Sequence, residues 1–394
     1  MNKTNEVYLV GGVRTPIGGF CGAFLTVPAP ALGSAAIKAA VARAEIPAGQ
    51  IDEVIFGNVV SAGLGQNVAR QAAIGAGLSP NVGATSVNKV CGSGLKAVML
   101  AAQSIKCGDA SVIVAGGTEN MSRAPYLLEK ARTGYRLGNG EVIDAMIRDG
   151  LWDVYNNVHM GNCGDRCAEK YSFTRQQQDD YAATSFKRAI EATSKGLFVP
   201  EIEPVQVQSG RETITVGEDE NLKKFNEEKL RKLPPAFGEK GTITAGNASS
   251  INDGAAALVV VSAEKVKELG LKPQARILGY STYSREPEWF TTAPIGAISK
   301  LLKMLSLQAA AVDLFEINEA FSVVPMAAMK ELGIPHEKLN VHGGAVALGH
   351  PIGASGARTL VTLLSAMKQR GARVGVNSLC LGGGEAVAMA VELC

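Results

Sequence analysis

The sequence lacks an excess of charge of either sign and lacks long apolar stretches. It has 39 Lys and Arg against 37 Asp and Glu, a formal net charge of +2. A nucleic-acid-binding protein shows a strong basic excess on one face, so no nucleic-acid partner is expected. No segment approaches the roughly 18 uninterrupted apolar residues of a membrane span.

The N-terminal segment MNKTNEVYLVGGVRTP lacks two further features. It has neither the long apolar region of a signal peptide nor the Arg- and Ser-rich character of a transit peptide. We therefore expect a soluble, cytoplasmic protein with no membrane partner.

The sequence also lacks an even, closely spaced set of cysteines, since its Cys residues are odd in number and widely scattered. They are Cys21, Cys91, Cys107, Cys163, Cys167, Cys380 and Cys394. Disulfide frameworks belong to small secreted domains, so free thiols in a reducing compartment are expected. Cys163 and Cys167 are spaced like half of a metal site, but no convincing second pair appears. We interpret both as structural and expect no metal.

Glycine is abundant, with 45 residues in 394, and it permits tight turns and close backbone approaches. The length exceeds the ~250–300 residues at which a single core stops growing, which predicts two or three packed units. Short β-branched runs alternate with Ala-rich helical patterns, and this predicts βαβ construction with largely parallel, buried sheets. The clearest predicted strands are residues 54–56, 112–115, 257–261 and 374–378.

Two predicted helices belong to a faint internal repeat. One opens at Ser93 and stops at Gly108, and the other opens at Ser355 and stops at Gly371. Duplicated βαβ halves would bring equivalent loops to a shared crevice beyond the carboxyl ends of the strands. Chance similarity between two βαβ units is the alternative. Residues from about 118 to 246 hold most of the charged runs and predict an inserted, solvated region.

Cys91 lies in the turn SVNKVCGSGLKAV, which joins a predicted strand to the first repeat helix. The unpaired N–H groups and dipole of a helix N-terminus favour a thiolate. For a lone Cys, a small buried packing residue is the stronger interpretation.

His350 changes that balance, because it is one of only four His and occupies the equivalent turn of the second repeat, in GGAVALGHPIGASG. A thiol and an imidazole on equivalent turns could meet across the crevice. A surface-turn His is the alternative.

Cys380 ends another predicted strand and precedes three glycines, Gly382 to Gly384. Main-chain N–H groups there could form an oxyanion site. Because the pKa of a free cysteine thiol is about 8.5, this side chain could exchange a proton near neutral pH. A buried strand-end Cys is an equally good interpretation of this residue alone.

Asn318 and Glu319 follow the apolar run 312–317. A polar pair there could hold a water or orient a His, or Asn318 could cap a helix.

Together these motifs closely resemble the thiolases. They are CGSG at 91–94, NEAF at 318–321, GGAVALGHPIGASGAR at 343–358 and CLGGG at 380–384. The likeness runs from VRTPIGGF near the start to the last strand. It implies an α/β, thiolase-like fold of two pseudo-repeated halves, 1–118 plus about 249–271 and 272–394, around a CoA-binding loop domain, 119–248.

The resemblance also implies roles. Cys91 carries the acyl group as a thioester, and His350 activates that thiol. His350 and a water held by Asn318 line one oxyanion hole, and N–H groups at Cys91 and near Gly382 form another. Cys380 exchanges the α-proton of the second substrate. The expected reaction joins two acetyl-CoA into acetoacetyl-CoA and CoA, with no permanently bound cofactor, in a homotetramer.

The segments that differ among thiolases indicate which acyl chain is accepted and how CoA is bound. HMG, at His159 to Gly161, resembles the short-chain branch, in which Met160 narrows the acyl pocket; a plain core Met is the alternative. Ser249 matches a serine that contacts the pantetheine of CoA. Near the nucleotide the matching residues are Lys224, Phe225, Asn226 and Lys229. Asn221-Leu222 stands where many relatives have Arg, so the phosphate-binding side chain is left open.

Three alternatives compete with this interpretation. One is a broader 3-ketoacyl-CoA thiolase of fatty-acid degradation. Another is a thiolase-like lipid-binding protein without catalysis, which the intact Cys91, His350 and Cys380 argue against. The third is a ketoacyl-synthase-like enzyme, but these generally have His where this chain has Cys380.

Overall fold

The structure is a computed structural model that describes residues 6–394. Part of the expectation about the N-terminal segment falls on residues 1–5, which lie outside the described residues. Within residues 6–394, none of the helices combines the length and the apolar character needed to cross a membrane.

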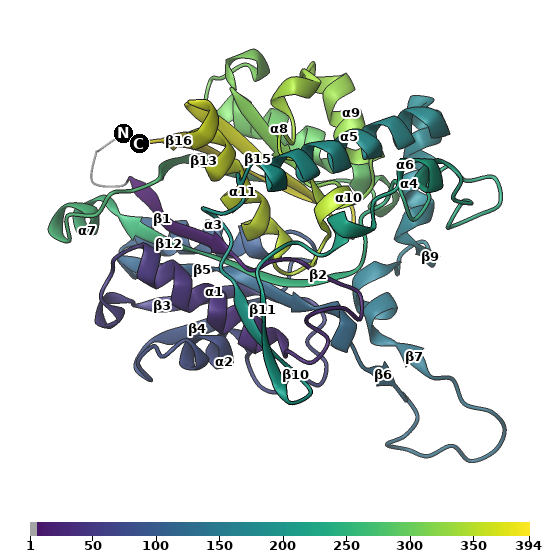
Figure 1. The fold of residues 1–394 in the computed structure, drawn as a ribbon, viewed down its shortest axis with the longest axis horizontal. Coiled ribbons are helices and arrows are strands. Elements are labelled where there is room, and N and C mark those ends of the chain that lie inside the picture. Colours follow the sequence, from purple (N-terminus) through teal and green to yellow (C-terminus); the bar gives the residue numbers. More distant parts are fainter. Residues whose placement is uncertain (1–5) are drawn as a thin grey trace.

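A ten-stranded sheet is the largest sheet in the described part of the chain (Figure 1). Its strand order is β14-β15-β16-β13-β1-β12-β5-β3-β4, and the short β2 pairs with β12. The strands are β1 (Val7–Arg14), β2 (Gly18–Gly19), β3 (Glu53–Gly57), β4 (Gly83–Val87), β5 (Val112–Asn120), β12 (Asn252–Ser262), β13 (Ala275–Ser284), β14 (Leu314–Ile317), β15 (Val374–Leu381) and β16 (Glu385–Leu393).

The expectation of largely parallel strands was wrong. β3 runs parallel to β4 and β5, and β14 parallel to β15, but β12 is antiparallel to β1 and β5, and β16 to β13 and β15. The β15–β16 connection shows the reason, because it is only the three-residue turn Gly382 to Gly384. A parallel pair needs a crossover of a dozen or more residues, and helical crossovers join the parallel strands β3, β4 and β5, and likewise β14 and β15.

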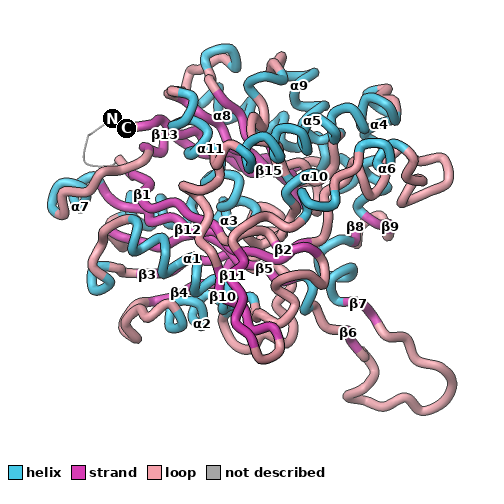
Figure 2. Tube along the Cα trace, viewed as in Figure 1, coloured by secondary structure: helices cyan, strands magenta, loops and turns pink. Residues whose placement is uncertain are grey.

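Helices cover both faces of the sheet (Figure 2). They are α1 (Ala29–Arg43), α2 (Val68–Gly75), α3 (Ser93–Cys107), α4 (Met160–Tyr171), α5 (Arg175–Ser194), α6 (Glu227–Arg231), α7 (Ala263–Glu268), α8 (Ala293–Met304), α9 (Val323–Leu332), α10 (Ala345–Leu348) and α11 (Ser355–Arg370). On β12, Val259 packs in the core with α1, whereas Leu258 packs with α3 and α11. This alternation follows from the two faces of a strand.

The predicted repeat helices are confirmed as α3 and α11, and each ends at the predicted glycine. Gly108 has φ 84° and Gly371 φ 64°, the left-handed conformation in which glycine closes a helix. The two helices cross at their N-terminal ends. A Cβ added to Gly94 would lie 2.7 Å from the Ala357 nitrogen, and one on Gly356 would lie 2.2 Å from the Leu95 nitrogen. This close crossing brings the two preceding turns together.

The segment between β5 and β12 forms the insert and carries α4, α5, α6 and the remaining short strands. These are β6 (Tyr126–Leu127), β7 (Ile143–Asp144), β8 (Trp152–Asp153), β9 (Val158–His159), β10 (Val205–Ser209) and β11 (Glu212–Val216). An extended loop between β6 and β7 projects from the body (Figures 1 and 2). Arg14 of β1, fully buried, ties the insert to the sheet through Glu201 at 2.6 Å and Asp219 at 2.7 Å. The predicted domain limits stay predictions.

Candidate active site

Cys91 lies in the turn between β4 and α3 and is buried. The turn is tight, since Val90 has φ 45°, a conformation that costs a β-branched residue free energy. The Ser93 hydroxyl holds it by donating to the Val90 carbonyl at 2.6 Å. A Cβ on Gly92 would lie 2.5 Å from the Leu381 side chain, so the Cys91 turn packs directly on the end of β15.

Cys380 and Gly382, at the end of β15 and just after it, therefore lie beside Cys91. The N–H groups of Gly382 and of Cys91 itself hydrogen-bond the Cys91 sulfur and lower its pKa, but burial is the larger effect and raises the pKa to about 12. Burial and then the charge of Cys91 raise the pKa of Cys380 well above its ordinary value. The thiolate expected from the helix N-terminus is therefore not the resting state of Cys91. Both thiols are protonated at neutral pH.

His350 occupies the turn between α10 and α11 and is also buried. Its backbone N–H donates to Asn252 Oδ1 at 2.9 Å, and its Nδ1 lies 2.6 Å from Ser355 Oγ. Because Ser355 occupies Nδ1, Nε2 is the ring nitrogen available to a reacting proton. Burial, followed by the positive charge of Arg358, lowers the pKa of His350 to about 3. The imidazole is neutral at pH 7 and can accept a proton.

The His350 turn packs against Cys91, because Ile352 and Cys91 share one apolar cluster with Val59 and Val60. The two equivalent turns of the repeat are therefore neighbours, as the sequence predicted. We call the space between the turns that carry Cys91, His350 and Cys380 the crevice.

Asn318 completes the crevice. It is buried, its Nδ2 lies 3.4 and 3.5 Å from the two ring nitrogens of His350, and its Oδ1 has no hydrogen-bond partner within residues 6–394. An unpartnered buried oxygen is suited to bind a water. The alternative of a helix cap was wrong, since the next helix, α9, begins only at Val323.

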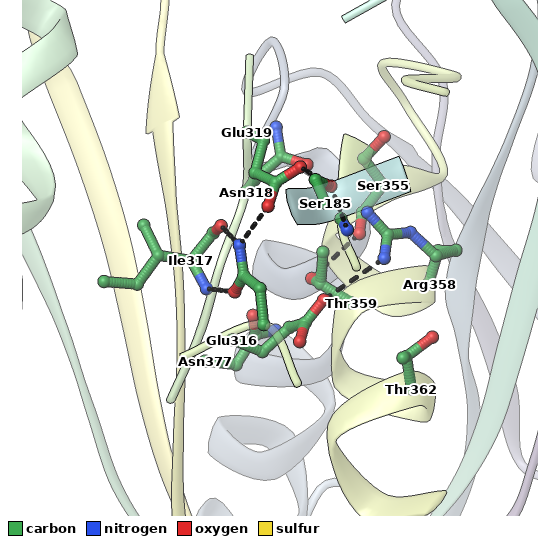
Figure 3. Close-up of polar contacts among 12 residues, drawn as sticks. Ser185, Glu316, Ile317, Asn318, Glu319, Ser355, Arg358, Thr359, Thr362 and Asn377 are labelled. Atoms are coloured by element: carbon green, nitrogen blue, oxygen red, sulfur yellow. Dashed lines mark hydrogen bonds and ion pairs between the residues drawn. The ribbon is translucent and has the colours of Figure 1, made fainter. Parts of the chain in front are cut away.

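Glu319 points away from the crevice, so the structure does not support the possibility that it orients His350. Its carboxylate accepts from Tyr181 of α5 at 2.9 Å and from Asn340 Nδ2 at 2.8 Å. It also accepts from Ser185 of α5 at 2.7 Å (Figure 3). The residue joins the strand end at β14 to the insert.

Glu119 is a residue that sequence reasoning missed. Its fully buried carboxylate accepts N–H bonds from Val59, Val60 and Gly353, at 3.0, 3.1 and 2.8 Å, and a fourth from the Asn58 amide at 2.9 Å. Burial raises its pKa to about 7, against the effect of those bonds. Through these hydrogen bonds, Glu119 ties the loop that carries His350 to the segment at Val59 and Val60, which packs beside Cys91. A carboxylate at the end of an apolar strand was the available signal.

Met160 and His159 lie at the start of α4. The Met160 methyl carbon lies 3.4 Å from where a Gly382 Cβ would be, so this side chain forms a wall beside the reacting turns. His159 caps α4, accepting from the Gly161 N–H at 3.1 Å, and its ring stacks on Phe237 with centroids 4.5 Å apart. Burial lowers its pKa.

Lys224 and Lys229, both exposed, line one cavity of about 330 Å³ in the insert, which we call the insert cavity. Phe186 and Phe225 stack there with ring centroids 4.5 Å apart. Its other lining residues include Asn221, Asn226, Ser250 and Val346. Ser249 is adjacent, and its hydroxyl donates to the Ala320 carbonyl at 3.0 Å.

Cys163 and Cys167 are buried on one face of α4. Burial raises the pKa of Cys163 to about 12 and that of Cys167 to about 11, so both are thiols. Within residues 6–394, no three or more His, Cys, Asp and Glu side chains are grouped so that they could hold a metal ion.

Comparison with known proteins gives a consistent result. The family model for the thiolase N-terminal domain matches residues 7–264, and that for the thiolase C-terminal domain matches residues 271–393. Acetyl-CoA acetyltransferase 2 of Arabidopsis thaliana is 55% identical over 98% of this chain and 97% of its own. The cytosolic acetyl-CoA acetyltransferase of Gibberella zeae is 50% identical over 100% and 99%.

A solved structure agrees in fold. The crystal structure of a thiolase from Ascaris suum in complex with coenzyme A has a TM-score of 0.94 and 43% identity, covering 99% of this chain and 100% of that one. The predicted fold class is confirmed. Because both domain models match and the relatives span the chain from end to end, the protein belongs to the thiolase family.

Proposed function

We propose that the protein is an acetyl-CoA C-acetyltransferase that joins two acetyl-CoA into acetoacetyl-CoA and CoA, reversibly. The observation that carries the proposal is the crevice. There the buried Cys91 sulfur accepts hydrogen bonds from two backbone N–H groups and adjoins the neutral imidazole of His350 and the thiol of Cys380. The names of relatives that are 50–55% identical support the same activity.

In the first half-reaction, His350 Nε2 removes the Cys91 proton as the sulfur attacks the carbonyl carbon of acetyl-CoA. The N–H groups of Cys91 and Gly382 hold the oxyanion, because they already point at the sulfur position. The carbon–sulfur bond to CoA then breaks, and the proton passes to the CoA sulfur. Coupling the proton transfer to attack is required because the resting Cys91 is a thiol.

In the second half-reaction, the neutral His350 takes the thiol proton of Cys380, and the resulting thiolate removes a proton from the methyl carbon of another acetyl-CoA. A water held by Asn318 stabilises the enolate oxygen beside His350. The carbanion attacks the acetyl carbonyl and the bond to the Cys91 sulfur breaks. Cys91 then takes the proton held by His350, so that the cycle ends with both cysteines as thiols and His350 neutral. These steps use side chains, backbone groups and one water, with CoA thioesters as substrates and no resident cofactor.

The insert cavity is the proposed site for the nucleotide part of CoA. Lys224 and Lys229 provide positive charge for phosphate, and the stacked Phe186 and Phe225 provide an apolar surface. Ser249 lies towards the crevice and would contact the pantetheine. A thiolase that is 43% identical is solved in complex with coenzyme A, which supports this placement.

We also propose a cytoplasmic homotetramer. Edge strand β4 leaves most of its residues exposed, and the loop between β6 and β7 carries Leu137, 99% exposed. Edge strands present backbone groups that pair with other chains, and a second copy would cover this apolar side chain. The Gibberella zeae relative is named cytosolic. Light scattering should give the mass of four chains; a monomer in solution would refute the assembly.

A chain-length profile in the thiolysis direction, with CoA as co-substrate, tests the substrate assignment. We expect kcat/KM to be highest for acetoacetyl-CoA and to fall as the acyl chain lengthens, because Met160 closes the pocket beside Gly382. A value that rises with chain length would favour a broad 3-ketoacyl-CoA thiolase instead.

A further inference from the structure

Glu319 is a fully buried carboxylate whose hydrogen bonds come from three separate segments. Tyr181 and Ser185 of α5 donate one bond each, and Asn340 donates a third from the loop before α10. The fourth comes from the backbone N–H of Val346 at 3.1 Å. These donors fill the positions around both oxygens, and the mechanism above uses none of them.

One of these donors lines the insert cavity, and a second is the chain neighbour of a lining residue. Val346 lines the cavity itself, and Ser185 immediately precedes Phe186, which also lines it. A ligand that fills the cavity therefore contacts the segments that hold Glu319.

On its other side, Glu319 adjoins Asn318 in the chain, and the two side chains point in different directions (Figure 3). Asn318 points at His350, whereas Glu319 points at α5. The preceding Ile317 is fixed by Asn340, which bonds both its N–H and its carbonyl at 2.8 Å. The backbone that carries Asn318 is thus held by the same Asn340 that donates to Glu319.

We propose that Glu319 is a positioning residue that links the insert cavity to Asn318, so that the nucleotide part of CoA, bound in the cavity, holds the Asn318 amide in its working position. The inference rests on the proposed function. Binding energy from a remote part of a substrate can be used at the reacting centre, and truncated substrates then lose kcat as well as affinity. The substrate class that uses this link is a thioester with a phosphorylated nucleotide.

The experiment compares condensation of acetyl-CoA with condensation of the acetyl thioester of N-acetylcysteamine, which has no nucleotide. In the wild type, kcat should be higher with acetyl-CoA. In Glu319→Gln, an NH2 group replaces one carboxylate oxygen, so the groups that donated to that oxygen lose their acceptor. We therefore expect kcat with acetyl-CoA to fall about tenfold. With the truncated thioester, kcat should change less than twofold.

Two further variants keep the test independent of folding. Ser185→Ala removes one donor from the insert side and should shift the same ratio in the same direction, by less. Ser194→Ala, on the exposed end of the same helix, is the matched control and should leave both rates unchanged.

An equal loss on both thioesters in Glu319→Gln and Ser185→Ala would mean a purely structural role and overturn the link, as would no loss on either. A wild type that acts only on a longer 3-ketoacyl-CoA would instead refute the substrate assignment. The same comparison would then be run with that acyl chain, and equal losses would again overturn the link.

Discussion

The crevice and the insert cavity hold their functional groups in opposite ways. In the crevice, Cys91, His350 and Cys380 are buried, and backbone N–H groups, packed turns and a buried carboxylate fix them. In the insert cavity, Lys224 and Lys229 are exposed on flexible side chains. The difference teaches where each kind of substitution should act. Changes in the crevice should act on kcat, and changes at the cavity rim should act on KM.

The largest effect is expected at Cys91, where a change removes the nucleophile. Cys91→Ser should lower turnover by at least about a thousandfold, and acetyl-CoA should no longer add an acetyl group to the intact protein in a mass spectrum. Cys107→Ser, at an exposed thiol, is the control and should acetylate like the wild type. Acetylation of Cys91→Ser at the normal level would show that another residue carries the acyl group.

Cys380→Ser should separate the two half-reactions. The protein should still form the acetyl-enzyme, because Cys91 and its N–H partners are untouched, while condensation falls roughly a hundredfold or more through loss of the base. Rapid-quench measurement of acetylation beside steady-state condensation checks this. Normal condensation would mean that Cys380 is not the base.

Met160→Ala should change selectivity more than rate. Shortening the wall beside Gly382 should raise kcat/KM for 3-ketoacyl-CoAs longer than acetoacetyl-CoA by roughly tenfold, the scale of a methylene in an apolar pocket. The chain-length profile of the variant checks this. An unchanged profile would mean that Met160 is a core residue and does not limit the length of the acyl chain.

The smallest effects are expected at the lysines of the insert cavity. Lys224→Ala and Lys229→Ala should each raise the KM for CoA about two- to fivefold, since exposed ion pairs contribute about 0.2–1 kcal/mol, and kcat should hold. The effect should shrink as salt is added. Lys223→Ala is the matched control, because Lys223 pairs with Glu218 and does not line the insert cavity. A large fall in kcat would break the distinction between crevice and cavity.

The sequence by itself determined the order of the motifs and the local elements that carry them. The spacing of apolar residues and the stop glycines set α3 and α11, and the resemblance of the two halves predicted that Cys91 and His350 would occupy neighbouring turns. These features are local, or repeat a local pattern, so they survive without knowledge of the distant contacts. The family resemblance supplied the roles, and for the individual site residues these stay predictions.

Only the tertiary structure decided how burial changes the chemistry. The N-terminus of α3 favours a thiolate at Cys91, yet desolvation outweighs it and raises the pKa to about 12, because segments far apart in the chain exclude water there. The same is true of the carboxylates. Glu119 and Glu319 each accept bonds from segments that are distant in sequence, so no local pattern revealed what they hold. The antiparallel strands around β12 and β16 likewise depend on pairings between distant segments, which alternating strand and helix signals do not specify.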